Sequence, residues 1–333
     1  MVQPYVKIRT TNPDGTTADI TELCRAITWS GDSNSVSRTL TFSPIVSEVD
    51  TMLPAAPTEL GGSAQFWQGN TLLMDAFSLQ RTRDSLSSAI DVIAYDRGIY
   101  LTRNKKTMRV AAQTAETVTE ALCREFGIQI GALAVTGVPL TRNFLGVNLY
   151  KIIMTMYTLA ADQTRKKYRI RFRGALLEVV EMVQTAESIL LRPGCNLLSF
   201  TAKEDASNVI NSVALYDDEY NQLSVHQDDD AVSLYGLMRE VVKASSYDDP
   251  VAHAKKLLAE NGMKTSISLN ALGNPKLITG NTVVVQEPVT NTYGLFWITG
   301  DTHTWKRNIY QTKLSLSLEA IMDSQTAGSL PTE

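Results

Sequence analysis

The clearest pattern of hydrophobic and polar positions lies near the C-terminus, between Tyr310 and Leu318. A period of two over these nine residues is typical of a strand with one buried face and one wet face. The face predicted to be buried comprises Tyr310, Thr312, Leu314, Leu316 and Leu318, and the wet face comprises Gln311, Lys313, Ser315 and Ser317.

Further strands are predicted just before this one, at residues 282–285, 295–299 and 301–305. A turn signal, Gly280-Asn281, precedes them, and Lys306-Arg307-Asn308 predicts another turn. Successive strands with one buried face indicate an antiparallel sheet, closed into a barrel or packed as a sandwich.

The N-terminal third is also predicted to be β-rich. Asn12-Pro13-Asp14-Gly15 predicts a turn, and Gly69-Asn70 predicts a two-residue hairpin. Residues 44–62, rich in proline and glycine, are expected to form a long loop. Residues 1–106 are therefore predicted to be a first β domain. Its expected strands are 6–10, 38–42, 64–68, 71–81 and 89–95.

The middle of the chain changes character. Residues 97–106 are polar and basic and are expected to be a connector. Two helices are predicted next, one capped by Thr114 and one starting after Asn148, because their apolar residues recur at helical spacing. A hairpin over 168–180 follows, so residues 107–192 are predicted to be a small α/β insert.

Residues 193–322 are predicted to form a second β domain. Asp249 and Pro250 predict the start of its one helix, over 250–261. The tail 323–333 is small and polar and is expected to be flexible. The predicted fold class is mainly β with an α+β insert: two antiparallel β-barrel domains flanking a small α/β domain.

Composition narrows the class of protein. The chain has 333 residues, 44% hydrophobic and 20% charged, with a formal net charge of -4, and these values favour an ordinary globular protein over a general nucleic-acid or membrane binder. No signal-like segment and no apolar run of about 18 residues is found, so we expect a protein made and kept in solution. Cys24, Cys123 and Cys195 are widely spaced and are expected to be reduced thiols.

The sequence contains no phosphate-binding loop, nucleophile elbow or zinc-protease motif. Asp301 and His303 share a strand face, but no nucleophile accompanies them, so catalysis there is disfavoured. Two acidic runs, 217–219 and 228–230, are better explained as solvated turns than as cation sites. No catalytic, cofactor-binding or metal-binding residue is predicted.

A basic run is the more specific feature. Lys167, Arg169, Arg171 and Arg173 share one face of a strand whose other face carries Tyr168, Ile170 and Phe172. The structural interpretation is that the basic residues form the exposed face of the strand and the apolar residues its buried face. The functional interpretation is an interface that meets acidic segments of a neighbouring chain or, as the less favoured alternative, phosphates. Like charges in a row are unfavourable, so carboxylates are expected nearby. Trp297 and Trp305 are further interface candidates, although tryptophan serves cores equally well.

Several short segments resemble one family when their order and spacing are taken together. Ile90–Asp96, continuing through Tyr100-Leu101 to Asn104-Lys105, resembles a segment of XkdQ/YqbQ-like baseplate hub proteins of contractile phage tails and tail-derived bacteriocins. Residues 115–153 are similar to the central helical segment of that family. Pro193–Asn196 followed by Val209–Val213, Tyr235-Gly236 and the strand around His303 also fit its pattern.

This resemblance, which extends to gp27-type and late-control-protein-D-type hubs, implies a structural role without enzymatic activity or cofactors. It implies two tail-tube-like barrels per chain and a homotrimer that adapts the hexameric tail tube to the trimeric central spike. The implied partners are other copies of the chain, the tail tube or tube-initiator protein, the central spike, a baseplate wedge or LysM-type hub partner, and the tape measure protein. It implies neither a membrane nor a specific nucleic acid as partner. It also implies a protein made in the bacterial cytoplasm that becomes part of a phage tail, bacteriocin or other contractile injection system.

Two other classes remain open from the residues alone. A phage-derived cell-wall hydrolase would use Asp301 or His303. A carbohydrate-binding β module would use Trp297 and Trp305 to stack on sugars.

Overall fold

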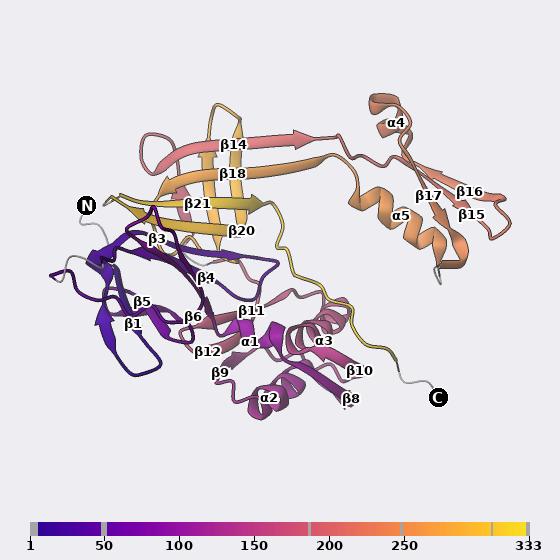
Figure 1. The fold of residues 1–333 in the computed structure, drawn as a ribbon. Coiled ribbons are helices and arrows are strands. Elements are labelled where there is room, and N and C mark those ends of the chain that lie inside the picture. The colour runs from indigo at the N-terminus through magenta and orange to yellow at the C-terminus, as the bar shows by residue number, and fades with distance from the viewer. Residues whose placement is uncertain (1–5, 48–51, 186–187, 247–248, 308, 331–333) are drawn as a thin grey trace. The chain divides into compact units, whose positions relative to one another are not determined.

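The computed structural model describes residues 6–47, 52–185, 188–246, 249–307 and 309–330. It is mainly β, with 49% strand and 18% helix, which confirms the predicted fold class. The chain divides into two compact units, one formed by Met1–Phe200 with Ser268–Glu333 and one by Thr201–Ile267. Figure 1 labels the elements of both units.

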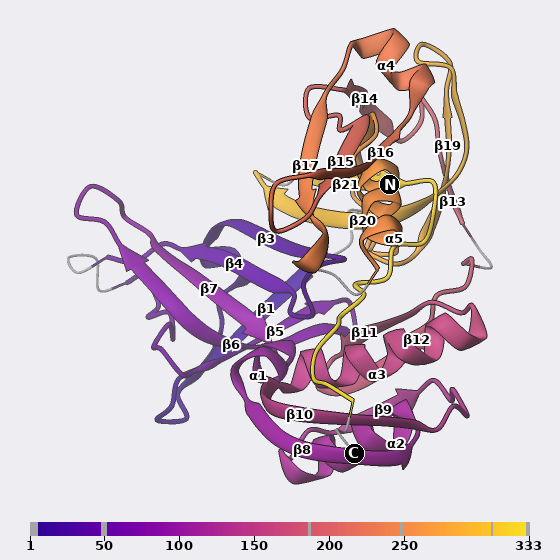
Figure 2. The ribbon, with the colours of Figure 1, turned by 90° about the vertical axis from the view of Figure 1, so that its right-hand side faces the viewer.

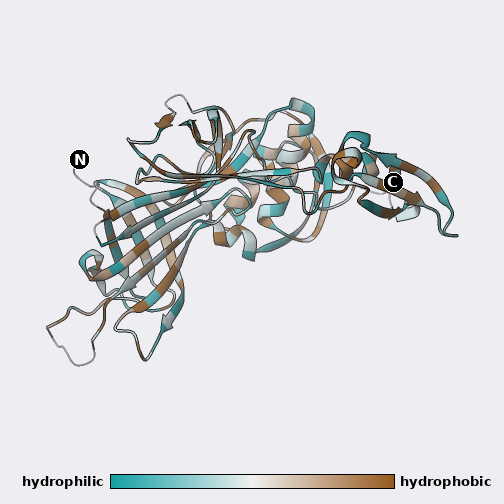
Figure 3. Ribbon diagram, turned by 90° about the horizontal axis from the view of Figure 1, so that it is seen from above, coloured by the Kyte–Doolittle hydropathy of each residue, from teal (hydrophilic) through white to brown (hydrophobic). Residues whose placement is uncertain are grey.

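The N-terminal strands of the first unit form an antiparallel array in the order β3-β4-β7-β6-β5-β1-β2. The predicted hairpin at Gly69-Asn70 joins β5 to β6. Hydrophobic and hydrophilic residues alternate along the strands (Figure 3). The array contains β1 (Val6–Thr11), β2 (Thr17–Asp19), β3 (Cys24–Asp32), β4 (Thr39–Pro44), β5 (Ser63–Gln68), β6 (Thr71–Arg83) and β7 (Ile90–Asp96), with a short 3-10 turn at Thr21–Leu23.

The C-terminal strands of the same unit are β19 (Thr282–Glu287), β20 (Thr292–Lys306) and β21 (Ile309–Ser317). The alternation predicted for β21 is confirmed: its apolar face is buried and its polar face is largely exposed. Leu318 is 71% exposed because the strand ends one residue earlier. The strands predicted at 295–299 and 301–305 form one continuous strand with a bulge between Ile298 and Gly300. Asn308, part of a predicted turn, lies outside the described residues.

The two groups of strands belong to a single sheet. β20 pairs with β21 along one edge, and its other edge is shared between β19, over Thr292–Trp297, and β3, over Gly300–Lys306. The sheet continues beyond β21 through β18 (Lys264–Leu272) to β14 (Leu197–Asp205), while β13 (Ile189–Leu191) pairs with β19. The N-terminal and C-terminal β regions are therefore joined by main-chain hydrogen bonds. The two-barrel arrangement and its boundaries stay predictions.

The insert packs around a central helix, α3 (Leu149–Thr164), which lies against β10 and β11 (Figure 2). Thr114 caps α2 as predicted, and α3 starts after Asn148 as predicted, with Asn148 as its cap. Each side chain accepts a hydrogen bond from a backbone N–H three residues later. The other elements are α1 (Gly98–Arg103), β8 (Lys105–Gln113), α2 (Ala115–Glu125), β9 (Ile130–Leu133), β10 (Leu140–Asn148), β11 (Tyr168–Arg173) and β12 (Leu176–Glu181).

The predicted connector at 97–106 is wrong for most of its length. Asp96 accepts a hydrogen bond from the backbone N–H of Gly98 (2.9 Å), and Leu101 is fully buried, so a short helix forms where the polar composition suggested a loop. Strand β8 then begins at Lys105, so the predicted domain boundary after residue 106 falls inside a strand.

The second unit has a small core of its own. Val213, Leu215, Val242 and Ala254 are buried between a three-stranded sheet and helix α5. Asp249 and Pro250 start α5 as predicted, with the Asp249 carboxylate accepting from Ala252 N–H at 2.9 Å. The unit contains β15 (Ser212–Tyr216), β16 (Gln222–Gln227), α4 (Asp229–Tyr235), β17 (Arg239–Lys243), a 3-10 turn (Ala244–Ser246) and α5 (Pro250–Glu260).

Across the described residues, no helix is both long and apolar enough to span a bilayer.

The C-terminal segment corrects the expectation of a flexible tail, as far as its described residues reach. Asp323 accepts a hydrogen bond from Tyr150 of α3, and Ala327 N–H donates to Thr155 (3.0 Å). Ser329 exchanges two backbone hydrogen bonds with Asn143 of β10. Gly328 lets the backbone lie close to the insert, because a Cβ there would overlap the carbonyl oxygen of Asn143.

We expect deletion of residues 319–333 to lower the free energy of unfolding by roughly 2–4 kcal/mol, since each lost hydrogen bond contributes about 1 kcal/mol. Urea unfolding followed by circular dichroism measures this difference. Leu330→Ser, at a side chain that is 67% exposed, is the control and should leave the midpoint unchanged. Equal midpoints for the long deletion and the intact chain would contradict the packed tail.

Candidate functional site

The pairing of β3 with β20 is accompanied by a buried ion pair. The Arg38 side chain donates to both carboxylate oxygens of Asp301, with Nη1 at 3.0 Å from Oδ1. The Arg38 guanidinium also lies 4.0 Å from the centre of the Trp29 ring. A bidentate arginine–carboxylate contact stacked on an aromatic ring restrains arginine in both direction and plane.

Asp301 has further partners on the loop before β19. Thr279 donates to Asp301 Oδ1 through its backbone N–H (2.7 Å) and its hydroxyl (2.6 Å). Burial alone would raise the pKa of Asp301, but the Arg38 charge and the hydrogen bonds from His303 and Arg38 hold it below its ordinary value. Asp301 is therefore ionised at neutral pH, and its carboxylate links β20 to Arg38, which directly precedes β4, and to this loop.

His303 belongs to the same buried group. Its Nε2 lies 3.1 Å from the Leu277 carbonyl oxygen and 3.3 Å from Asp301 Oδ2, and both acceptors require a proton on Nε2. Its Nδ1 then accepts from the Tyr310 hydroxyl at 2.8 Å. Neither Asp301 nor His303 reaches solvent, so these two side chains serve as scaffold.

Two glycines make room for two arginines at this point of the fold. A Cβ added to Gly31 would overlap the guanidinium of Arg38, and a Cβ added to Gly280 would overlap that of Arg169. Gly280 also has φ +82°, which L side chains rarely adopt. Arg169 Nη1 donates to the carbonyl oxygen of Thr279, so β11 of the insert is attached to the same loop.

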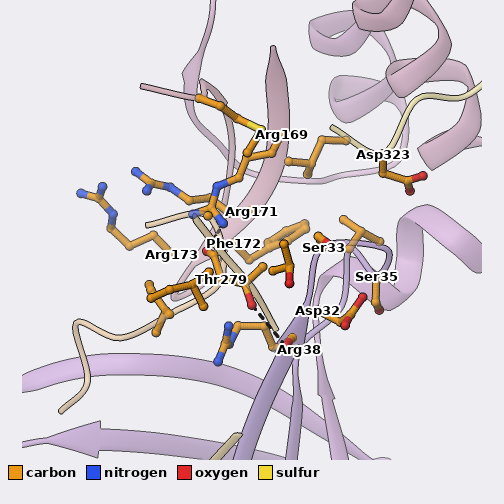
Figure 4. A pocket seen from close by; sticks show the side chains of 18 of the residues that line it. Asp32, Ser33, Ser35, Arg38, Arg169, Arg171, Phe172, Arg173, Thr279 and Asp323 are labelled. Atoms are coloured by element: carbon orange, nitrogen blue, oxygen red, sulfur yellow. Dashed lines mark hydrogen bonds between the residues drawn. The ribbon is translucent and has the colours of Figure 1, made fainter. Parts of the chain in front are cut away.

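Around these groups lies a pocket of about 310 Å³. In Figure 4, Arg171 and Arg173 lie on one side and Asp32, Ser33 and Ser35 on the other, with Arg169, Thr279 and Phe172 between them. Trp29, Met154, Ile278 and Trp297 add apolar surface to the lining. The pocket therefore combines apolar walls with several arginines.

The basic strand predicted from the sequence forms part of this pocket. Arg171 pairs with Glu178 of β12 at 2.7 Å, and Arg173 lies 3.4 Å from the same carboxylate, which confirms the expected neighbouring acid. Lys167 and Arg173 are exposed as expected, whereas Arg169 and Arg171 are half-buried. Arg169 and Arg171 are less exposed because the loop before β19 lies over this part of the strand. The alternation of residues within the strand does not indicate that contact.

The two tryptophans have different environments. Trp297 is partly buried and lines the pocket. Trp305 is only 9% exposed and stacks on Tyr310 with ring centres 4.2 Å apart, so it is a core residue rather than an interface residue. A sugar could not stack on a ring that is already covered on this face.

The acidic runs have local roles. Asp228 caps α4 by accepting from Ala231 N–H at 3.0 Å, and Asp217 accepts from Asn221 N–H at 2.7 Å. Within the described ranges, no three His, Cys, Asp or Glu side chains are grouped so as to hold a metal ion.

Sequence reasoning did not single out Arg38, Thr279 or Gly31. Arg38 begins a predicted strand, Thr279 precedes a predicted turn, and the strand that contains Gly31 was not predicted. The alternation of Ile27 and Trp29 with Ala26, Thr28 and Ser30 is a signal that could have identified that strand. No local signal indicates that Arg38 meets Asp301, 263 positions later.

We expect Asp301→Asn to lower the free energy of unfolding by about 3–5 kcal/mol, because it leaves Arg38 buried without its counter-charge. Asp32→Asn is the matched control, since Asp32 is an exposed carboxylate on β3; its effect should stay within about 0.5 kcal/mol. Denaturant unfolding of both variants measures the difference. Similar losses for the two would contradict the role given to the ion pair.

The Asp301 ion pair also predicts a pH dependence. Because the folded-state pKa of Asp301 lies below its ordinary value of 3.8, its stabilisation is present above about pH 4 and is lost as the pH falls through the lowered pKa. The stability gap between the natural chain and Asp301→Asn should therefore narrow in acid. Thermal unfolding of both from pH 7 to pH 3 tests this; a gap independent of pH would contradict it.

Comparisons with known proteins agree with this architecture. The phage-like element PBSX protein XkdQ of Bacillus subtilis (strain 168) is 21% identical over 252 residues, which span 72% of this chain and 76% of XkdQ. The 43 kDa tail protein of prophage MuSo2 from Shewanella oneidensis has a similar fold, with a TM-score of 0.68 at 10% identity over 93% of this chain and 98% of its own. The E. coli c3393 protein, a type VI secretion component described as similar to the bacteriophage T4 tail proteins gp27 and gp5, matches with a TM-score of 0.52 at 13% identity over 99% of this chain and 78% of its own. The YQBQ-like family matches residues 27–317, and this chain belongs to that family.

Proposed function

We propose that this chain is the structural hub of a contractile tail baseplate, and that three copies assemble to join the tail tube to the central spike. The observation that carries the proposal is the tail-protein fold, which extends over nearly the whole chain and not over one part of it. The matching family and the fold relatives are structural tail proteins, so the chain acts by assembly and not by catalysis.

The sheet arrangement supports this role on physical grounds. Each chain carries two groups of antiparallel strands joined through β3 and β20. Three chains would bring together six such groups, which suits a sixfold tube on one side and a threefold spike on the other. The main strand order of the sheet ends at β2 and β14, and a side branch ends at β13; the unpaired edges of strands are surfaces that other chains can extend.

The partners follow from the same proposal. They are other copies of this chain, the tail tube or tube-initiator protein, the spike, the tape measure protein, and a baseplate wedge or LysM-type hub partner. Lys167, directly before β11, and Arg173, its last residue, are exposed and are proposed to meet acidic segments of one of these neighbours. The assembled protein would be part of a phage tail or a tail-like particle.

The proposal predicts a particle of three times 36.6 kDa in solution. Size-exclusion chromatography with light scattering measures this mass, and negative-stain electron microscopy should show a threefold ring. The measurement is made with the chain alone and with the cognate spike protein added. A strictly monomeric chain at micromolar concentration, with no ring even beside the spike, would rule the proposal out.

A further inference from the structure

Arg169 differs from the arginines next to it. Arg38 binds the carboxylate of Asp301 and Arg171 binds that of Glu178, whereas Arg169 has no carboxylate within ion-pair distance among the described residues. Its acceptor there is the backbone carbonyl oxygen of Thr279. A guanidinium has five N–H donors in a fork, so most of its capacity to bind an anion is unused.

The position of Arg169 is specifically accommodated by the fold. Its guanidinium lies against Gly280, where an added Cβ would overlap it. Burial lowers the pKa of Arg169 to about 10, with smaller contributions from Arg171 and Arg38, so the side chain still carries its charge at neutral pH. The carboxylates of Asp301 and Glu178 act on this charge and partly offset the lowering of its pKa, but each is bound by another arginine.

The nearby carboxylates have other partners. Asp32 accepts from the backbone N–H of Asn34 (2.8 Å). Asp323 accepts from the Tyr150 hydroxyl and from the Gln325 side-chain amide (2.7 Å). Both line the pocket, but neither forms an ion pair with Arg169. The pocket therefore has one guanidinium whose charge no described carboxylate binds directly.

The remaining lining indicates what kind of anion would fit. Trp29, Phe172, Ile278 and Trp297 supply apolar walls to the cavity of about 310 Å³. Apolar walls with a few convergent polar groups are typical of ligand pockets of this size. Such walls suit a carboxylate on an apolar stem better than a strongly hydrated phosphate, because burying a hydrated ion against apolar surface is unfavourable.

We propose that this pocket is a binding site for a carboxylate carried on an apolar stem, with Arg169 as its ion-pair partner. The carboxylate comes from a small organic acid or from an acidic side chain beside an apolar one on a partner polypeptide. The site is independent of the hub role, since it needs only the residues of one chain.

Ligand-observed NMR titration of the full chain tests the site, with hexanoate as probe and hexanamide as its uncharged match. Hexanoate should bind at least about tenfold more tightly than hexanamide, as expected for a charge-assisted hydrogen-bonded pair. Arg169→Met should remove that preference. Lys167→Met removes one positive charge directly before β11, outside the pocket, and should retain the preference. Equal binding of the two probes, or an unchanged preference in Arg169→Met, would overturn the proposal.

A further variant controls for the possibility that Arg169→Met misfolds. Arg169→Lys keeps the charge but lacks the fork, so it should fold and bind hexanoate more weakly than the natural chain; undiminished binding would count against the proposal. A blocked dipeptide, acetyl-Leu-Glu-amide, distinguishes the two sources. Tighter binding of the dipeptide than of hexanoate assigns the site to a partner polypeptide, and the reverse order assigns it to a small acid.

Discussion

The pairing of β3 with β20 is the constraint on which the rest of this fold depends. It places Asp301 opposite Gly31 in a fully buried position. A buried carboxylate is tolerated only when it is paired and hydrogen-bonded. Asp301 therefore requires Arg38 as its counter-charge and Thr279 as its hydrogen-bond donor. Arg38 then covers Trp29, and Thr279 brings its loop within reach of the insert. One strand pairing thereby sets the positions of three parts of the chain.

Most local features of the chain could be predicted from its sequence. The alternation in β21, the Gly69-Asn70 hairpin and the helix caps at Thr114, Asn148 and Asp249 all depend on residues a few positions apart. Each of these signals lies within a short stretch of sequence, so it can be recognised without knowing the tertiary structure. The connector at 97–106 failed because burial of Leu101 is a tertiary effect, and tertiary packing overrides composition.

The site was predicted less well, for a different reason. The two faces of β11 and the neighbouring carboxylate of Glu178 follow from alternation and charge balance. That one arginine of the row would lie under the loop at Thr279-Gly280 does not, because the loop is more than a hundred positions away. The burial of Trp305 also depends on a residue that its own strand does not contain. Its strand was predicted, but the ring of Tyr310 that covers it comes from the neighbouring strand.

The distance along the chain between β3 and β20 also governs how the protein can be made. During synthesis, β3 emerges roughly 270 residues before its partner (residues 24–32 against 292–306), so one edge of the N-terminal sheet stays open until the last strands leave the ribosome. Long-range pairings of this kind fold slowly and leave unpaired edges exposed to other chains. The pairing that makes the sheet continuous therefore has a cost during synthesis. Until β20 has paired with β3, the newly synthesised protein is most vulnerable to aggregation.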